Sequence, residues 1–373
     1  MKFRALFVAA LAAFGASAPA AETKTEPLAL GAAAPDFKLP GVDDRDWSLS
    51  DFKDARALVI VFTCNHCPTA QAYEERLKKI GADYKAKGVA LIAISPNDPK
   101  SLRLDELGYT DLSDTLEEMK LRARDKGFDF PYLYDGDKQE VSRAYGPTAT
   151  PHAFVFDADR KLRFVGRIDD SERESAVKIQ DLRNALDAIL AGKTPEVAQT
   201  RVFGCSVKWA GKQDQVKAFM DKAAREPVTL ETVDAAGLKA LRKGAGDKFR
   251  LVNFWATWCG PCIAEFPELV EIYRMYGHRD FEMVTVSTNF PDEKEEVLKF
   301  LKNHQASMKN LLWNSGDKNA LMEAFEPSWN GGVPYTVLLS PKGEIVYKED
   351  AGAIDPLVVK RAIVDALGRQ KVK

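Results

Sequence analysis

The chain carries one arrangement of residues twice: a run of apolar residues, two cysteines separated by two residues, and a segment with helical spacing. In the first half the run is RALVIVF, residues 56–62, and FTCNHCP follows at 62–68. In the second half LVNFW, 251–255, leads into WCGPC, 258–262. Such apolar runs are typical of strands buried on both faces of a sheet. The repeat therefore predicts two similar α/β units.

The order of the other elements is repeated as well, and 373 residues are enough for two domains with separate cores. Helices are expected at 69–87, 112–126, 172–191, 213–225, 263–276 and 355–367, and further strands at 89–95, 154–156, 162–165, 281–287, 337–339 and 345–347. This alternation predicts a central mixed sheet flanked by helices in each unit. The expected division is a signal peptide at 1–21, a first domain at 28–209, a linker helix at 210–226 and a second domain at 227–373.

Charge and hydropathy exclude two classes of partner. The net charge is −2, and lysine and arginine are scattered among the acidic residues, so the chain has no basic field for nucleic acid. After the N-terminus, no segment has the ~18 consecutive apolar residues of a membrane-spanning helix. We therefore expect neither nucleic-acid binding nor a membrane span.

The N-terminus has the pattern of a secretory signal peptide. Met-Lys-Phe-Arg precedes a short apolar stretch of small residues, and the small residues Ala18, Ala20 and Ala21 mark a cleavage site after Ala20 or Ala21. An uncleaved N-terminal anchor is the alternative. Cleavage would deliver the protein to the periplasm or the exterior.

Five cysteines limit the chemistry. A structural disulfide normally joins distant segments, and closing a loop of two residues restrains the unfolded chain very little. Zinc could bind two such pairs, but the pairs belong to units that each look complete. A thiol at the start of a helix is stabilised as thiolate by unpaired amides, and a second thiol one turn away can resolve a mixed disulfide. The spacing favours redox centres and predicts that the first cysteine of each pair begins the helix.

The second unit resembles the TlpA-like branch of the thioredoxins in FWATWCGPCIAEFPEL, 254–269, and in GVPYT, 332–336. The resemblance implies Cys259 as nucleophile, Cys262 as resolving thiol and Glu265 as the acid/base group near them. It also implies a cis-proline at Pro334, preceded by Val333, that docks substrate backbone. For Glu265 the alternative is a carboxylate on the helix surface.

The first unit resembles the redoxin group, which joins thioredoxin-like and peroxiredoxin-like proteins, in APDF at 34–37, FPYL at 130–133 and TATP at 148–151. By this resemblance Cys64 and Cys67 are the redox pair, and Thr150 precedes a cis-proline at Pro151. The two resemblances imply thiol–disulfide exchange with protein or small thiol substrates and an upstream thiol reductant or oxidant. They imply no organic cofactor and no metal.

Two other functions remain open. Peroxiredoxins share a P-x-x-x-T-x-x-C motif, and neither Cys64 nor Cys67 has the threonine three residues earlier or the proline, which argues against a peroxidase. A copper chaperone could use the cysteines with His66, but no methionine-rich or C-x-x-x-C set supports it.

His66 lies between the first two cysteines, as in the oxidising DsbA-type motif. A histidine there would stabilise the thiolate and raise the reduction potential, whereas Gly-Pro is typical of a reducing centre. Electrons would then pass from Cys259/Cys262 to Cys64/Cys67. An exposed histidine with little effect is the alternative.

Two further residues have open roles. Cys205, in GCSVKW at 204–209, is either a third redox thiol that returns to Cys64 or a small buried apolar residue. His152 follows the expected cis-proline, and it either faces Cys64 or has a packing role.

Overall fold

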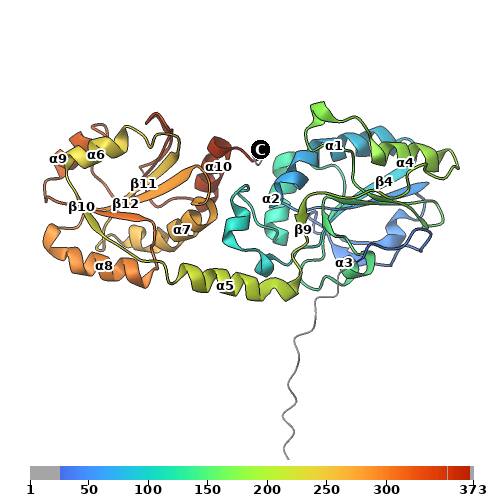
Figure 1. Cartoon of the computed structure of the whole chain (residues 1–373), viewed down its shortest axis with the longest axis horizontal. Coiled ribbons are helices and arrows are strands. Elements are labelled where there is room, and N and C mark those ends of the chain that lie inside the picture. Colours follow the sequence, from blue (N-terminus) through green and yellow to red (C-terminus); the bar gives the residue numbers. More distant parts are fainter. Residues whose placement is uncertain (1–25, 351, 370–373) are drawn as a thin grey trace, which may run out of the picture.

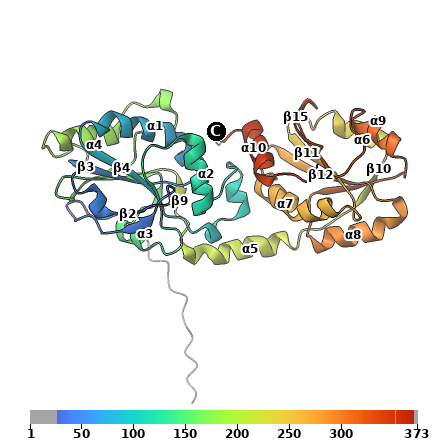
Figure 2. The same cartoon turned by 180° about the vertical axis from the view of Figure 1, so that it is seen from behind.

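The computed structural model describes residues 26–350 and 352–369. The predicted signal peptide lies outside the described residues. Within them the chain forms two lobes side by side, each with its own sheet, and one helix runs along an edge of both (Figures 1 and 2). That helix is α5, Gln213–Ala223, which lies inside the predicted linker.

The first lobe is built on a five-stranded sheet in the order β5-β4-β3-β7-β8. The strands are β3 (Ala57–Phe62), β4 (Val89–Ser95), β5 (Tyr132–Tyr134), β7 (His152–Phe156) and β8 (Leu162–Gly166). The helices are α1 (Pro68–Lys85), α2 (Leu116–Lys126), α3 (Glu140–Tyr145) and α4 (Asp181–Leu190). Two short ribbons accompany them: β1 (Lys38–Pro40) with β2 (Asp46–Ser48), and β6 (Ala149–Thr150) with β9 (Cys205–Ser206).

Strand β3 is fully buried on both faces, as its apolar run predicts. Val59 and Val61 belong to the core beneath α1, α2 and α4, while Ile60 and Phe62 belong to the core on the opposite face. This alternation is the two-residue period of a strand. Because β3 is the central strand, the cysteine motif that follows it lies at the middle of the sheet, beyond the carboxyl end of β3.

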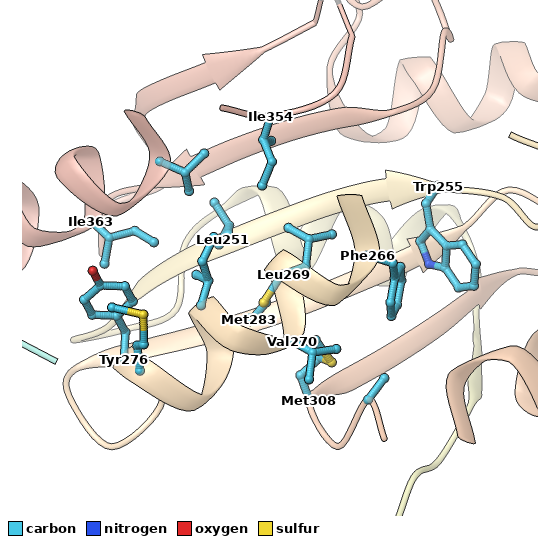
Figure 3. Packing of buried hydrophobic residues seen from close by; sticks show 14 of the residues in the cluster. Leu251, Trp255, Phe266, Leu269, Val270, Tyr276, Met283, Met308, Ile354 and Ile363 are labelled. Atoms are coloured by element: carbon cyan, nitrogen blue, oxygen red, sulfur yellow. The ribbon is translucent and has the colours of Figure 1, made fainter. Parts of the chain in front are cut away.

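The second lobe has a six-stranded sheet in the order β10-β13-β12-β11-β14-β15. The strands are β10 (Glu231–Val233), β11 (Phe249–Trp255), β12 (Phe281–Ser287), β13 (Lys309–Trp313), β14 (Tyr335–Leu339) and β15 (Ile345–Glu349). The helices are α6 (Ala235–Arg242), α7 (Gly260–Tyr276), α8 (Lys294–Asn303), α9 (Lys318–Phe325) and α10 (Pro356–Leu367). Figure 3 shows the face under α7, where Phe266 and Leu269 pack against side chains of β11. The predicted fold class, two tandem α/β domains, is confirmed.

Two predicted helices begin later than expected. The segment 172–180 does not extend α4, because the carboxylate of Asp170 accepts the backbone N–H groups of Lys178 and Ile179 at 2.8 and 3.0 Å and holds a loop there. Helix α2 begins at Leu116 rather than at residue 112, because the Thr115 side chain caps it by accepting the Glu118 N–H. The late start leaves Asp114 in the preceding loop.

That loop also joins the lobes. Leu102 and Leu107 belong to the buried cluster that contains α7. The Tyr276 hydroxyl donates to the Thr110 carbonyl at 2.7 Å. Beside it, Asp111 pairs with Arg361 at 3.0 Å and with Arg369 at 2.5 Å. The segment 102–111 of the first lobe is therefore part of the docking surface for the second.

Candidate active sites

In the second lobe, Cys259 begins helix α7 as its N-cap residue. Its Sγ accepts the backbone N–H of Cys262 at 3.3 Å, and the two cysteines form a disulfide. The Val333–Pro334 peptide bond is cis, and the Val333 carbonyl oxygen lies 3.5 Å from the Cys259 Sγ. The thiol predicted to start this helix does so, directly beside the cis-proline loop.

Glu265 lies on the buried side of α7, with 4% of its surface exposed, so the surface alternative was wrong. Its Oε1 accepts from the Asn253 side chain at 3.0 Å, and its Oε2 accepts the Ile354 N–H at 2.8 Å. Burial raises the pKa of this carboxyl, and the two hydrogen bonds offset the rise only in part. A buried carboxyl with a raised pKa is a candidate proton acceptor and donor for the nearby thiols.

In the first lobe the prediction that Cys64 begins the helix was wrong. Cys67 is the N-cap residue of α1, and its Sγ accepts the Ala70 N–H at 3.4 Å. The reason is Pro68, which takes the first helical position, where a missing N–H costs nothing. Cys64 remains in the loop between β3 and α1.

Strand register gives the same correspondence between the lobes. Phe62 pairs with the residue after cis-Pro151, and Phe254 pairs with the residue after cis-Pro334. Cys67 follows Phe62 by the same number of residues as Cys259 follows Phe254. The second cysteine of the first pair thus corresponds to the first cysteine of the second pair.

Thr150, just before Pro151, contacts both thiols of the first centre. Its carbonyl oxygen accepts a hydrogen bond from the Cys67 thiol at 3.2 Å, and its hydroxyl lies 3.2 Å from the Cys64 Sγ. Both cysteines are buried. Burial, followed by the hydrogen bond to Cys67, raises the pKa of the Cys64 thiol well above its usual range.

His66 is buried and ion-paired, so the exposed alternative was wrong. Its Nδ1 lies 2.6 Å from Asp114 Oδ2, and its backbone N–H donates to Asp114 Oδ1 at 3.0 Å. Two more donors, the Asn65 N–H and the Asn97 side chain, complete the shell of this carboxylate. Burial lowers the pKa of His66, but the charge of Asp114, its hydrogen bond and the charge of Cys67 together outweigh burial, and the net direction is upward.

The surroundings of Cys67 favour its thiolate. Burial opposes ionisation, but hydrogen bonds from the thiols of Cys205 and Cys64, followed by the positive charge of His66, lower the pKa of Cys67 well below its usual range. The Ala70 N–H at the helix start acts in the same direction. Cys67 is therefore the thiol of this lobe that is prepared for nucleophilic attack.

Cys205 lies beside Cys67 rather than beside Cys64. Strand β9 pairs antiparallel with β6, which sets Cys205 opposite Thr150, and the Cys205 N–H donates to the Cys67 Sγ at 3.4 Å. Cys205 is partly exposed, and it packs on the small cluster that contains Cys64 and Cys67. The structure thus gathers all three thiols of the first lobe.

His152 follows the packing alternative. Its ring lies 4.7 Å from that of Phe154, and its Nδ1 accepts the Thr148 N–H at 3.3 Å. Burial lowers its pKa to about 4. It is a neutral core histidine at physiological pH.

Asp114 and Asn97 were not predicted from the sequence. Both lie in the polar segment after β4, far from the cysteines in sequence, and no motif marks them. Potential metal-binding atoms of Cys64, His66 and Asp114 lie within 4.8 Å of one another. However, the Asp114 carboxylate already accepts four hydrogen bonds. This saturation favours a role in orienting His66 over metal binding.

The fold and the paired cysteines define a thioredoxin-superfamily protein with two domains. The model of the AhpC/TSA family matches residues 30–165 and again 202–348. The chain belongs to this family, and both of its lobes carry the family fold.

Curated relatives include two proteins named thiol-disulfide oxidoreductase ResA. The one from Oceanobacillus iheyensis is 31% identical over 133 residues, which are 35% of this chain and 61% of the relative. The one from Bacillus subtilis is 33% identical over 95 residues, 26% of this chain and 49% of the relative. The chain thus spans about half to three-fifths of the length of these relatives.

Among solved structures, the hypothetical protein SMc02350 from Sinorhizobium meliloti 1021 is 35% identical, with a TM-score of 0.45, covering 51% of this chain and 99% of that one. A thioredoxin family thiol:disulfide interchange protein from Chlorobium tepidum TLS is 20% identical, with a TM-score of 0.29, over 37% and 86% of the two chains. In the described residues no helix is both long and apolar enough to cross a bilayer.

Proposed function

We propose that the protein is an exported thiol–disulfide oxidoreductase with two dithiol centres. One observation carries the proposal. In each lobe a cysteine caps the helix after the central strand and lies within 3.5 Å of the carbonyl oxygen that precedes a cis-proline. A helix start stabilises a thiolate, and the neighbouring loop gives a substrate a place to align.

At the second centre, the Cys259 thiolate attacks one sulfur of a substrate disulfide. A mixed disulfide forms, and the other substrate sulfur leaves as a thiolate. Cys262, fully buried one turn into α7, then attacks the Cys259 sulfur and expels the second substrate thiolate. Two electrons pass to the substrate, and the Cys259–Cys262 disulfide remains. Glu265, one turn beyond Cys262 on the buried side of α7, is the proposed acceptor of the Cys262 proton.

The first centre is the proposed electron acceptor of the pair. Stabilising the Cys67 thiolate favours the reduced form of its centre, which raises the reduction potential. The His66–Asp114 pair supports this direction at Cys67, whereas Gly260 and Pro261 supply no charge beside Cys259. Electrons would then move from Cys259/Cys262 to the first centre.

The docked arrangement separates the two centres. Helix α7 spans 17 residues, about 25 Å at 1.5 Å per residue, and its Tyr276 end contacts the first lobe while Cys259 lies at the opposite end. Direct exchange between the lobes therefore requires the second lobe to undock and turn on α5, or requires a diffusing thiol carrier.

The activity is tested with the full chain and a disulfide-bonded polypeptide, insulin, whose reduced chain precipitates and scatters light, with dithiothreitol as reductant. We expect turnover that falls at least 100-fold in Cys259→Ser and is unchanged in Asp54→Asn, an exposed surface variant. A Cys259→Ser variant with the same turnover as the wild type would contradict the proposal. Hydrogen peroxide consumption at Cys67, in place of disulfide reduction, would instead favour the peroxidase alternative. Export is tested by assaying the periplasmic fraction for a chain shortened at Ala20 or Ala21.

A further inference from the structure

The backbone before cis-Pro151 is already paired. Strand β6 has an outer edge at Ala149 and Thr150, and β9 forms an antiparallel ladder along it, with Thr150 opposite Cys205. An unpaired strand edge beside a reactive thiol is where an extended peptide would add as a further strand. Here a segment of the same chain fills that position.

The second lobe is an internal comparison. Its β14 begins at Tyr335, and among the strand pairings of the described residues none involves Val333, the residue before cis-Pro334. Trp258 is 55% exposed beside this centre. The edge next to Cys259 therefore stays open to a polypeptide, and the edge next to Cys67 does not.

Residues 203–208, here called the strap, are held tightly. A side chain at Gly204, which has φ +141°, would place its Cβ 2.0 Å from the Thr150 carbonyl oxygen, so only glycine fits. Val207 is buried, and the Lys208 N–H donates to the Asn97 side chain at 2.8 Å. Asn97 also donates to Asp114, so the strap and the His66 pair share one network.

We propose that the strap is a built-in substrate of the first centre, which presents Cys205 to Cys67 and keeps polypeptide disulfides out. Resting on the dithiol exchange proposed above, this assigns Cys67 and Cys205 as the pair that forms the disulfide, and low-molecular-weight disulfides as the substrate class.

Oxidation of the first centre by a small disulfide takes two exchange steps. The partly exposed Cys205, as thiolate, attacks a small disulfide RSSR, forms Cys205–S–S–R and releases RS⁻. The Cys67 thiolate then attacks the Cys205 sulfur and expels the second RS⁻. The products are a Cys67–Cys205 disulfide and two RS⁻, so two electrons pass from the protein dithiol to the small disulfide. Cys64, whose pKa is raised, stays protonated and donates its hydrogen bond to Cys67.

The bond is tested by mapping disulfides in the full chain after equilibration with oxidised glutathione, alkylation and trypsin digestion. Cys64 and Cys67 lie in the tryptic peptide 57–76, and Cys205 lies in 202–208. We expect a cross-link between these peptides in the wild type and in Cys64→Ser, and none in Cys67→Ser. A wild type that forms only the Cys64–Cys67 bond, or a Cys67→Ser variant that keeps the cross-link, would overturn the proposal.

Whether the strap shields Cys67 is tested with alanine substitutions at two glycines. Gly204→Ala should dislodge the strap and speed alkylation of Cys67 by iodoacetamide at least tenfold. Gly192→Ala is the matched control, because Gly192 also has a positive φ but no atom within 4 Å of the added Cβ. Equal Cys67 alkylation rates in both variants and the wild type would overturn exclusion. The disulfide map does not depend on these glycine variants. If disulfide reduction depends on Cys259 but no Cys67–Cys205 cross-link forms, the strap proposal is rejected while the proposed function stands.

Discussion

Cys67 in the first lobe and Cys259 in the second occupy the same position in their domains, although one is the second cysteine of its pair and the other the first. Each caps the helix that follows the central strand, and each lies beside the carbonyl oxygen that precedes a cis-proline. The remaining cysteine of each pair therefore lies on the opposite side of the capping cysteine in sequence. Cys262 lies inside its helix, whereas Cys64 precedes its helix.

The reversed order predicts which thiol of the first lobe reacts fastest. With Cys259 and Cys262 in their disulfide, iodoacetamide should label Cys67 at least tenfold faster than Cys64 at pH 7, because only thiolates react and the two pKa values move in opposite directions. Peptide mass spectrometry of Cys64→Ser and Cys67→Ser gives the two rates. Faster labelling of Cys64 than of Cys67 would contradict the assignment of Cys67 as the reactive thiol of this lobe.

Removing the partner of His66 should shift the pH profile of Cys67. In Asp114→Asn the imidazole loses the carboxylate that raises its pKa, so less positive charge faces Cys67 at neutral pH. The midpoint of Cys67 alkylation should then move to higher pH. Asp54→Asn, an exposed change in the same lobe, should leave the midpoint in place.

The same substitution should change stability in a defined pH window. The lowered pKa of Asp114 stabilises the fold above its ordinary value of 3.8, and the raised pKa of His66 stabilises it below 6.5 and is lost as pH rises through the folded value. Breaking a buried pair costs about 3 kcal/mol. The loss of unfolding free energy in Asp114→Asn should thus be largest between these two values. Urea titrations from pH 4 to 9 measure it, and a loss independent of pH would argue against a charged pair.

Glu265→Gln should alter the second centre mainly through proton transfer. The raised pKa of Glu265 makes the folded state bind more protons than the unfolded chain, so it costs stability as pH rises above 4.5. The glutamine variant should show a flatter dependence of Tm on pH. It should also resolve mixed disulfides at Cys259 more slowly, by about tenfold or more, as expected for loss of a general base. If the rate of mixed-disulfide resolution depends on pH in the same way in Glu265→Gln and in the wild type, the role of Glu265 is structural.

Asp111→Asn should loosen the docking of the lobes. Asp111 is buried and holds both Arg361 and Arg369, whereas Asp365 contacts only Arg369 and is largely exposed. Small-angle scattering should give a larger radius of gyration for Asp111→Asn and no change for Asp365→Asn. If electrons pass directly between the lobes, transfer should also be faster in the undocked variant. Slower electron transfer between the lobes in Asp111→Asn would instead indicate that transfer takes place in the docked form.

Much of the fold follows from local patterns. The buried strands β3 and β11, the helix starts near the cysteines and both cis-prolines are marked by apolar runs, proline and short motifs within a few residues. The signal for the cysteine order was also local, since Pro68 at the first helical position identifies Cys67 as the cap. The prediction failed because it placed the first cysteine of both pairs at the helix start and did not weigh Pro68.

The network around His66 could not be predicted in the same way. Asp114 and Asn97 reach the histidine from a loop that the chain adds after β4, and Cys205 reaches Cys67 only because β9 pairs with β6. These contacts depend on where distant segments pack. Neither hydrophobic period nor cysteine spacing contains that information.

The direction of electron flow between the two centres is set by their reduction potentials, which can be measured in the full chain. Equilibration in thiol–disulfide buffers, followed by alkylation and mass spectrometry, follows the peptides of the first lobe and the Cys259/Cys262 peptide separately. Electron flow from Cys259/Cys262 to Cys67 predicts that the second centre is more reducing by at least about 30 mV, which is tenfold in the equilibrium constant. Equal potentials, or a first centre that is the more reducing, would contradict electron flow from Cys259/Cys262 to Cys67.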